Sequence, residues 1–311
     1  MELKHLPTYV PGFRDSCNLR DLGGNVVPEG RVMRKGLVYR SAALGTFTAE
    51  ELAELADLHL RYVLDLRSKK EAQRLPDPAL DGIEQQRICG AIDRRGRDIN
   101  MSVGGLLRLF FTPRRVDSDP ESSITSALME LYSSIAFDNP AYQELFSRLK
   151  SGCTPLLFHC SEGKDRTGIA AMLILTALGF DEEDAVDSYV LTNLYRRSEL
   201  GALIDGHRKI MTAMPKLRLA AQFSKGVVRE FGERVFCEIH QQYGTLDAYF
   251  AQEYGLDADG LAEFRDRFLI RPEDLGKKSL GSTQSHLGFT VRPAGSVAGA
   301  GVAAGVASKD H

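Results

Sequence analysis

Residues 157–168, Leu-Phe-His-Cys-Ser-Glu-Gly-Lys-Asp-Arg-Thr-Gly, constrain the fold of this chain more than any other stretch. An apolar run precedes Cys160, and a run of helical character, residues 169–178, follows Arg166. This order predicts a strand, a tight loop and the start of a helix. The backbone N–H groups of such a loop point toward one place, where the helix dipole also favours negative charge. The sequence therefore predicts a phosphate-binding loop at residues 160–167, here named the signature loop, with a thiol at its centre.

The residue types in the signature loop suit a thiol-dependent reaction at phosphorus. The thiolate is the nucleophilic form of cysteine, and a helix N-terminus and nearby cations can lower a cysteine pKa to roughly 3.5–7.5. We expect Cys160 to attack the phosphoryl group and Arg166 to hold two of its oxygens. Water would then hydrolyse the phosphocysteine. Arginine and backbone amides stabilise the charge, so we expect no metal and no cofactor.

The other residues of the loop complete the predicted phosphate-binding set: Ser161, Glu162, Gly163, Lys164 and Thr167. Lys164 would add positive charge, and Thr167 would hydrogen-bond the sulfur and help it leave. A buried cysteine before a helix would explain an isolated Cys-x5-Arg. It does not explain the complete string with its glycine, lysine and threonine.

The string His-Cys-x-x-Gly-Lys-Asp-Arg-Thr-Gly resembles the signature of the cysteine-dependent protein tyrosine phosphatases. It is most similar to the branch typified by mycobacterial tyrosine phosphatase B and a Listeria phosphatase. Further segments resemble that branch: residues 18–24, residues 38–42, residues 63–68 with Glu71, and residues 243–246 with Tyr249. The resemblance runs from about residue 6 to residue 270. It implies phosphotyrosine as a substrate, and several members also accept phosphoserine, phosphothreonine or phosphoinositides.

A phosphatase also needs a general acid that protonates the leaving oxygen. The family carries an aspartate on a loop outside the signature, and Asp93 stands at about that place if the alignment shifts by one residue. Asp165 is the alternative, although it could equally be ion-paired or orient the water of the second step. Asp98 is a third candidate. The predicted catalytic set is therefore Cys160 and Arg166, with Asp165 and Asp93.

Three more polar residues are expected to support the loop. His159 would set its conformation through hydrogen bonds from the ring. Asp65 and Arg67 stand at the C-terminal end of a predicted strand, where α/β sheets carry ligand loops, although a structural ion pair between them is the favoured interpretation. Cys89 or Cys153 could form a disulfide with the catalytic cysteine under oxidation, but a plain buried thiol is the default.

The remaining pattern predicts an α/β fold, with a central, mostly parallel sheet flanked by helices. Strands are predicted at residues 37–41, 62–66, 83–88 and 155–159, with 83–88 at an edge because it alternates weakly. A capping box at Thr48 opens a helix at residues 50–58. Further helices begin near Pro140 and Asp181, and residues 200–269 form a helical C-terminal part.

The 311 residues, 43% of them apolar, suit one large catalytic domain at residues 1–275. Residues 91–126 form a connection long enough to be a helical lid anchored by Phe110 and Phe111. A solvated loop with a short surface helix is the equal alternative. Residues 276–311 are rich in Gly, Ala, Ser and Val, and we predict that this tail is disordered.

Composition excludes several other classes of protein. A net charge of -3 gives no signal for nucleic-acid binding. The sequence has no apolar run of ~18 residues for a membrane span and no apolar stretch of a signal peptide at its start. Five cysteines without a Cys-x-x-Cys pair argue against a zinc site or a disulfide framework, so we expect a reducing, cytoplasmic setting.

The predicted function is a metal-independent phosphatase with a phosphocysteine intermediate. It would act on phosphotyrosine in proteins, with phosphoserine and phosphothreonine as further substrates. A phosphoinositide phosphatase is the first alternative, because Lys164 would suit a second phosphate group. A non-catalytic phosphate-binding module is another, although such a module has no need for a thiol. A sulfur-transfer or arsenate-reducing enzyme would be distinguished by turnover that depends on cyanide or arsenate.

Overall fold

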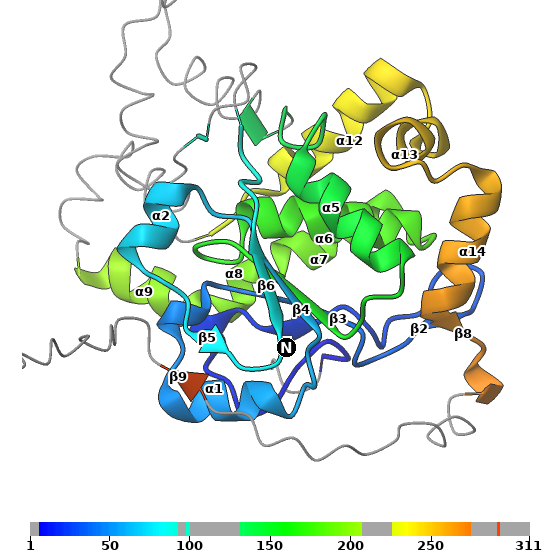
Figure 1. The fold of residues 1–311 in the computed structure, drawn as a ribbon. Helices are drawn as coiled ribbons and strands as arrows, with labels where there is room; N and C mark the ends of the chain where they lie inside the picture. Colours follow the sequence, from blue (N-terminus) through cyan, green and yellow to red (C-terminus); the bar gives the residue numbers. More distant parts are fainter. Residues whose placement is uncertain are drawn as a thin grey trace, which may run out of the picture.

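A five-stranded sheet forms the centre of the fold in the computed structural model (Figure 1), which describes residues 6–92, 98–99, 131–132, 134–206, 226–274 and 291–292. Its strands lie in the order β1 (Arg20–Asp21), β3 (Val38–Ser41), β7 (Leu156–His159), β4 (Tyr62–Asp65) and β6 (Glu84–Arg87). Only β1 is antiparallel to its neighbour. The predicted mostly parallel sheet is confirmed, with its weakly alternating strand, β6, at an edge.

The three central strands are buried along their whole length, whereas β6 is largely exposed. Strands that are covered on both faces need continuous apolar side chains, and the sequence Leu-Leu-Phe of β7 provides them. In the register, His159 lies opposite Ser41 on one side and opposite Asp65 on the other. The three residues therefore end the central strands at the same carboxyl edge of the sheet.

Each face of the sheet carries its own hydrophobic core. On one face, Leu64 and Phe158 pack in a large cluster with helices α5 (Pro140–Lys150), α6 (Asp165–Ala177), α7 (Glu182–Val190), α12 (Arg229–Tyr243), α13 (Leu246–Tyr254) and α14 (Ala258–Phe268). On the other face, Val63 and Leu157 pack against α1 (Ala49–Ala56) and the N-terminal segment. Figure 1 shows this layering, with α1 on the opposite side of the sheet from α5 and α6.

Helix α6 is the central helix of the molecule, since all thirteen of its residues are buried. A helix that is apolar all round belongs in the interior of a protein. Its first turn nevertheless carries Asp165, Arg166 and Thr167, which is the end that faces the carboxyl edge of the sheet. Three polar side chains at the start of a buried helix mark that edge as the place of the site.

Local sequence signals explain where several helices begin. The capping box predicted at Thr48 opens α1, and Asn139 caps α5 with Pro140 at its first position. The remaining elements of the described chain are α2 (Lys69–Arg74), α8 (Thr192–Tyr195), α9 (Arg197–Gly206), η2 (Asp15–Cys17), η3 (Leu44–Thr46), η4 (Pro272–Asp274), β2 (Val32–Met33) paired with β8 (Leu269–Ile270), and β5 (Ala79–Leu80) paired with β9 (Val291–Arg292).

Two predicted segments fall mainly outside the described residues. The predicted lid at residues 91–126, with Phe110 and Phe111, is described only at residues 91–92 and 98–99. Of the predicted tail at residues 276–311, only Val291–Arg292 is described, and it pairs antiparallel with Ala79–Leu80. Among the helices that are described, none combines the length and apolarity that crossing a bilayer requires.

Candidate active site

The signature segment folds as strand β7, a loop and the start of helix α6. Cys160 directly follows the last residue of β7, and α6 begins at Asp165. The side chains of Cys160 and Arg166 are almost completely buried, with residues 2% and 3% exposed. The loop therefore lies at the N-terminus of a buried helix, where backbone N–H groups and the helix dipole favour an anion.

Gly163 lets the signature loop pack directly on the end of strand β3. Its φ is +66°, and a Cβ at this position would lie 2.4 Å from the carbonyl oxygen of Ser41. The carbonyl oxygen of Gly163 accepts hydrogen bonds from Arg40 Nη2 at 2.6 Å and from Asn18 Nδ2 at 2.9 Å. The backbone N–H of Ala43 donates to the carbonyl oxygen of Ser161 at 3.2 Å. These contacts fix the orientation of the peptide planes in the loop.

Arg166 is held by a carboxylate from another part of the chain. Its Nη2 and Nη1 donate to Glu71 Oε1 and Oε2 at 2.7 and 2.9 Å, and Nη1 also donates to the carbonyl oxygen of Leu66 at 3.2 Å. The hydroxyl of Ser161 donates to Glu71 Oε1 at 2.7 Å. Burial alone would raise the pKa of Glu71, but the hydrogen bonds from Arg166 outweigh it and lower the pKa to about 2. The guanidinium is thus oriented before any ligand binds.

The orientation of Arg166 leaves one donor without a partner among the described residues. Its Nε is buried and makes no hydrogen bond within the described part of the chain. An arginine can grip a phosphate through Nε and one terminal nitrogen. This buried donor at the start of α6 is therefore suited to an anion in the loop.

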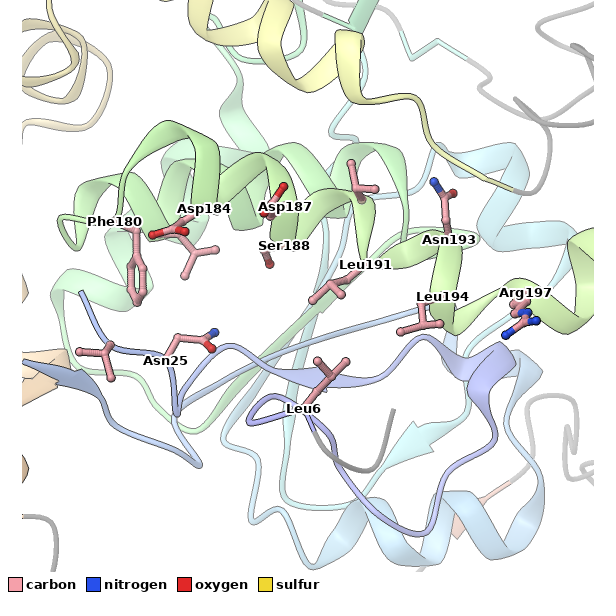
Figure 2. A pocket seen from close by; sticks show the side chains of 13 residues that line it. Leu6, Asn25, Phe180, Asp184, Asp187, Ser188, Leu191, Asn193, Leu194 and Arg197 are labelled. Carbon is pink, nitrogen blue, oxygen red and sulfur yellow. The ribbon is translucent and has the colours of Figure 1, made fainter. Parts of the chain in front are cut away.

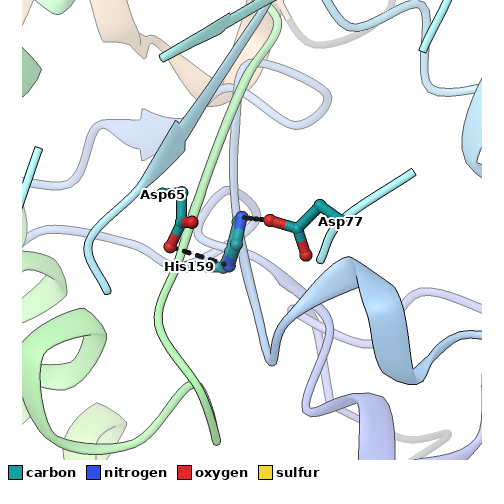
Figure 3. A group of neighbouring side chains, drawn as sticks. All are labelled: Asp65, Asp77 and His159. Carbon is teal, nitrogen blue, oxygen red and sulfur yellow. Dashed lines mark ion pairs between the residues drawn. The ribbon is translucent and has the colours of Figure 1, made fainter. Parts of the chain in front are cut away.

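His159 belongs to a buried ion network behind the loop (Figure 3). Its Nε2 lies 3.3 Å from Asp77 Oδ2, and its Nδ1 lies 3.2 Å from the carbonyl oxygen of Cys160. Arg67 donates to both oxygens of Asp65, at 2.8 and 2.9 Å, and also to Asp77. Burial alone would lower the pKa of His159, but the carboxylates of Asp77 and Asp65 raise it. The network therefore joins Arg67 and His159 to the same two carboxylates.

The same network is the one group of carboxylates and histidine in the described residues that could hold a metal ion. One ligand atom each from Asp65, Asp77 and His159 lie within 4.8 Å of one another. However, the guanidinium of Arg67 already donates to both carboxylates, so a cation occupies the position between them. We assign Asp65 and Arg67 as the structural ion pair that the sequence favoured.

Asp165, the alternative candidate for the general acid, is the first residue of α6. Its Oδ1 accepts a hydrogen bond from the hydroxyl of Tyr132 at 2.6 Å, and its Oδ2 lies 3.2 Å from Lys164 Nζ. Lys164 also donates to the carbonyl oxygen of Gly226 at 3.2 Å and is 4% exposed. Asp93 lies outside the described residues. Asp98 accepts a hydrogen bond from the backbone N–H of Lys69, at the start of α2.

Two further residues of the loop differ in their surroundings from what was expected. The hydroxyl of Thr167 is buried and makes no hydrogen bond with any described residue, so its expected bond to the sulfur is not formed. The side chain of Glu162 is ion-paired with Arg196, which is buried next to it. Glu162 therefore contributes to the site through its backbone rather than through a free carboxylate.

All five cysteines are free thiols in the structure. Cys89 is buried near the site, its Sγ donates to the carbonyl oxygen of Ala91 at 3.1 Å, and burial raises its pKa to about 11. Cys153 is partly exposed. The default expectation of a plain buried thiol agrees with the structure at Cys89, whereas Cys153 is only partly buried.

Three important contacts could not be assigned from the sequence, namely those of Glu71, Asp77 and Asn18. Glu71 stands in a segment that resembles the family, but that segment does not indicate its partner Arg166. Asp77 belongs to no recognisable motif. The pattern Asn-Leu-Arg-Asp at residues 18–21 gave one usable signal for Asn18, because it resembles an element of the phosphatase branch named above. Their roles depend on chain segments that meet only in the folded protein.

A separate cavity of about 850 Å³ lies beside α7 and α8 (Figure 2). It is lined mainly by apolar side chains, among them Leu6, Phe180, Leu191 and Leu194. No residue of the signature loop lines it. The chemistry of the site therefore belongs to the loop and not to this cavity.

Comparison with known proteins agrees with this geometry. Residues 12–270 match the model of the family described as the tyrosine phosphatase family. A Cupriavidus necator protein named as a tyrosine-protein phosphatase is 34% identical over 271 residues, which cover 83% of this chain and 87% of that protein. The triple specificity protein phosphatase PtpB of Mycobacterium tuberculosis is 29% identical over 195 residues, 59% of this chain and 68% of PtpB.

Among solved structures, that of TpbA from P. aeruginosa matches 58% of this chain and 79% of its own, with 16% identity and a TM-score of 0.28. The family match covers most of this chain, including the whole signature segment and the strands that carry it. The chain therefore belongs to the tyrosine phosphatase family.

Proposed function

We propose that this phosphatase hydrolyses phosphomonoesters through a phosphocysteine intermediate at Cys160, with phosphotyrosine in proteins as its principal substrate. One observation carries the proposal. Cys160 and a pre-oriented Arg166 share one loop at the N-terminus of α6, and Arg166 keeps a buried Nε donor without a partner among the described residues. A nucleophile and an anion-binding fork at the same point suit transfer of a phosphoryl group.

The proposed reaction has two steps. In the first, the thiolate of Cys160 attacks phosphorus, the bond from phosphorus to the leaving oxygen breaks, and a general acid protonates that oxygen. In the second, water attacks the phosphocysteine, the sulfur–phosphorus bond breaks, and the same carboxylate takes the proton from water. Arg166 and the backbone amides of residues 161–166 would bind the phosphate oxygens in both steps.

We assign the acid–base role to Asp165, because its carboxylate is held within the loop by Tyr132 and Lys164. Asp93 is kept as the alternative acid that the family resemblance implies. It stands on a segment of which the structure describes only parts. The two assignments predict different effects of Asp165→Asn on kcat for substrates with poor leaving groups.

The environment of Lys164 favours protein substrates over phosphoinositides. A phosphoinositide phosphatase needs a cation at the mouth of the site that is free to meet a second phosphate group. The ammonium group of Lys164 is buried and already contacts Asp165 and the carbonyl oxygen of Gly226. The mycobacterial relative is named a triple specificity protein phosphatase, so we include phosphoserine and phosphothreonine among the substrates to test.

Hydrolysis of p-nitrophenyl phosphate in EDTA and reductant tests this proposal. We expect turnover by the wild type, none by Cys160→Ser, and wild-type turnover by the matched control Cys153→Ser. Active enzyme would then be compared on phosphotyrosine, phosphoserine and phosphothreonine peptides and on phosphoinositide vesicles. Activity that survives in Cys160→Ser would exclude the thiol mechanism. A folded, reduced wild type without turnover would favour a binding module, and turnover only with cyanide or arsenate would favour the sulfur-transfer or arsenate-reducing class.

A further inference from the structure

Two arginines lie buried directly opposite each other at the antiparallel edge of the sheet. Arg20 on β1 pairs with Arg40 on β3, and the two residues are 1% and 0% exposed. Like charges opposite each other on neighbouring strands destabilise a sheet, and a buried charge is normally paired with an opposite one. A nearby anion would stabilise these two buried positive charges.

No carboxylate among the described residues forms an ion pair with either arginine. Arg40 donates through Nη2 to the carbonyl oxygen of Gly163 at 2.6 Å, while its Nε and Nη1 have no partner in the described chain. Arg20 donates to the carbonyl oxygen of Ser188 at 2.9 Å and to the hydroxyl of Thr192 at 3.0 Å. Thus Arg40 contacts the signature loop, and Arg20 contacts helices α7 and α8.

Four groups of the described chain act electrostatically on Arg40, and one of them belongs to the signature loop. They are Arg20 on β1, Tyr189 on α7, Tyr195 on α8 and Cys160 in the loop. Burial first, and the charge of Arg20 second, lower the pKa of Arg40 well below its usual range, whereas Cys160 acts in the opposite direction. Arginine nevertheless keeps its proton in proteins. Burial raises the pKa of both tyrosine hydroxyls, so the group among these four on which the proposed mechanism places negative charge is the sulfur of Cys160.

We propose that Arg40 is a positioning residue of the active site, whose buried charge lies behind the signature loop and stabilises first the thiolate of Cys160 and then the bound phosphoryl group. Its Nη2–H also holds the carbonyl of Gly163, where the loop turns. The proposal rests on the phosphatase function above and adds a second guanidinium to that of Arg166. The two differ in their contacts, since Arg166 is neutralised by Glu71 and Arg40 is not paired with a carboxylate in the described residues.

The test separates the charge of Arg40 from its hydrogen bond. Arg40→Gln keeps a donor for Gly163 and removes the charge, whereas Arg40→Lys keeps the charge. The first readout is the pH at which half of Cys160 reacts with iodoacetamide. Other charged or titratable groups that act on Cys160 include Arg67, Arg166 and Tyr142, and the ring of His159 lies 3.2 Å from its carbonyl oxygen. All of them are unchanged in both variants.

We expect Arg40→Gln to raise the alkylation midpoint by about one pH unit and to lower kcat/KM about tenfold or more. The alkylation midpoint of Arg40→Lys should stay within about 0.3 pH unit of the wild-type value, because the lysine places a positive charge at a similar distance from Cys160. Arg20→Gln is the matched control, because Arg20 is equally buried in the same strand pair but contacts α7 and α8 instead of the loop. Its alkylation midpoint should shift by less than half of the shift in Arg40→Gln. A wild-type midpoint and kcat/KM in Arg40→Gln would overturn the proposal, as would equal shifts in the Arg20 and Arg40 variants.

The test stays informative if Arg40→Gln does not fold or if the wild type shows no turnover. If Arg40→Gln does not fold, the prediction for Arg40→Lys still holds, and a midpoint raised by about one pH unit in that variant would contradict the role of the charge. Alkylation needs no turnover, so it is separate from the test of the phosphatase function. A wild type that hydrolyses no phosphoester would defeat the proposed function, whereas unchanged alkylation in the Arg40 variants of an active enzyme would defeat only this inference.

Discussion

Glu71 shows how one side chain links three parts of the site. Its carboxylate accepts hydrogen bonds from Ser68 at the start of α2, from Ser161 in the loop and from Arg166 on α6. Its pKa falls to about 2 on folding, against a reference near 4.5. A carboxyl group whose pKa is lowered by folding stabilises the protein above its unfolded pKa, and this contribution is lost as the pH falls toward the folded pKa.

Glu71→Gln should therefore destabilise the protein most at neutral pH. We expect a loss of about 2–3 kcal/mol in the free energy of unfolding at pH 7, with the difference from wild type shrinking between about pH 4.5 and pH 2. Urea unfolding at pH 7, 5 and 3 measures it, with the exposed Asp57→Asn as the control. A difference that stays constant over this range would show that the hydrogen bonds to Arg166 do not set the pKa of Glu71.

The proposed acid role of Asp165 predicts that the loss of kcat in Asp165→Asn depends on the leaving group of the substrate. Asp165→Asn should lower kcat about 100-fold on a phenyl phosphate with a poor leaving group, because general acid catalysis typically contributes 10²–10⁴-fold. On p-nitrophenyl phosphate the loss should be much smaller. Steady-state kinetics on a series of aryl phosphates measures this slope. Equal losses on all substrates would transfer the acid role to Asp93 and leave Asp165 with the water of the second step.

The signature loop, as an element, depends on the absence of a side chain at Gly163. Gly163→Ala would place a methyl group against the backbone of Ser41 at a positive φ, so the loop must shift. We expect kcat/KM to fall about 100-fold, the effect of misplacing reacting groups by about 1 Å. Gly30→Ala is the matched control, because Gly30 also has a positive φ but its Cβ would meet nothing within 4 Å. Similar kinetics for the two variants would refute a packing role of Gly163.

Elements with short-range signals could be predicted from the sequence, and contacts between distant segments could not. The capping box of α1, Pro140 at the start of α5 and the signature loop each depend on residues within a few positions of one another. Glu71 and Arg166 are 95 positions apart, and nothing local in either segment indicates the other. The partnership of Asp77 with His159 was missed for the same reason.

At the scale of the whole molecule, the order of the strands brings the site together. Because β7 lies between β3 and β4, His159 at the end of β7 lies between Ser41 and Asp65, directly before the signature loop. The sequence indicated the parallel strands and the edge position of β6, but not this order. It also gave no sign that Arg20 would lie opposite Arg40, because pairing between β1 and β3 is a property of the folded sheet.

We propose that residues up to about 275 form one catalytic domain. Within the part of the chain that the structure describes, the buried members of both hydrophobic clusters all precede residue 270. A variant that ends at Asp274 should therefore keep its Tm within about 2 °C and its kcat/KM within about twofold, since it loses only the pairing of β9 with β5 from the described structure. Thermal unfolding and p-nitrophenyl phosphate hydrolysis measure both. Loss of activity would make the C-terminal tail part of the domain.

The central claim is that a phosphoryl group passes through the sulfur of Cys160. The most direct measurement is a single-turnover reaction with a phosphotyrosine peptide, quenched in acid within milliseconds and analysed by mass spectrometry of the peptide that contains Cys160. We predict a phosphate group on Cys160 that appears before free phosphate and then decays. Release of phosphate by the active wild type with no phosphorylated Cys160 at any time would contradict the mechanism.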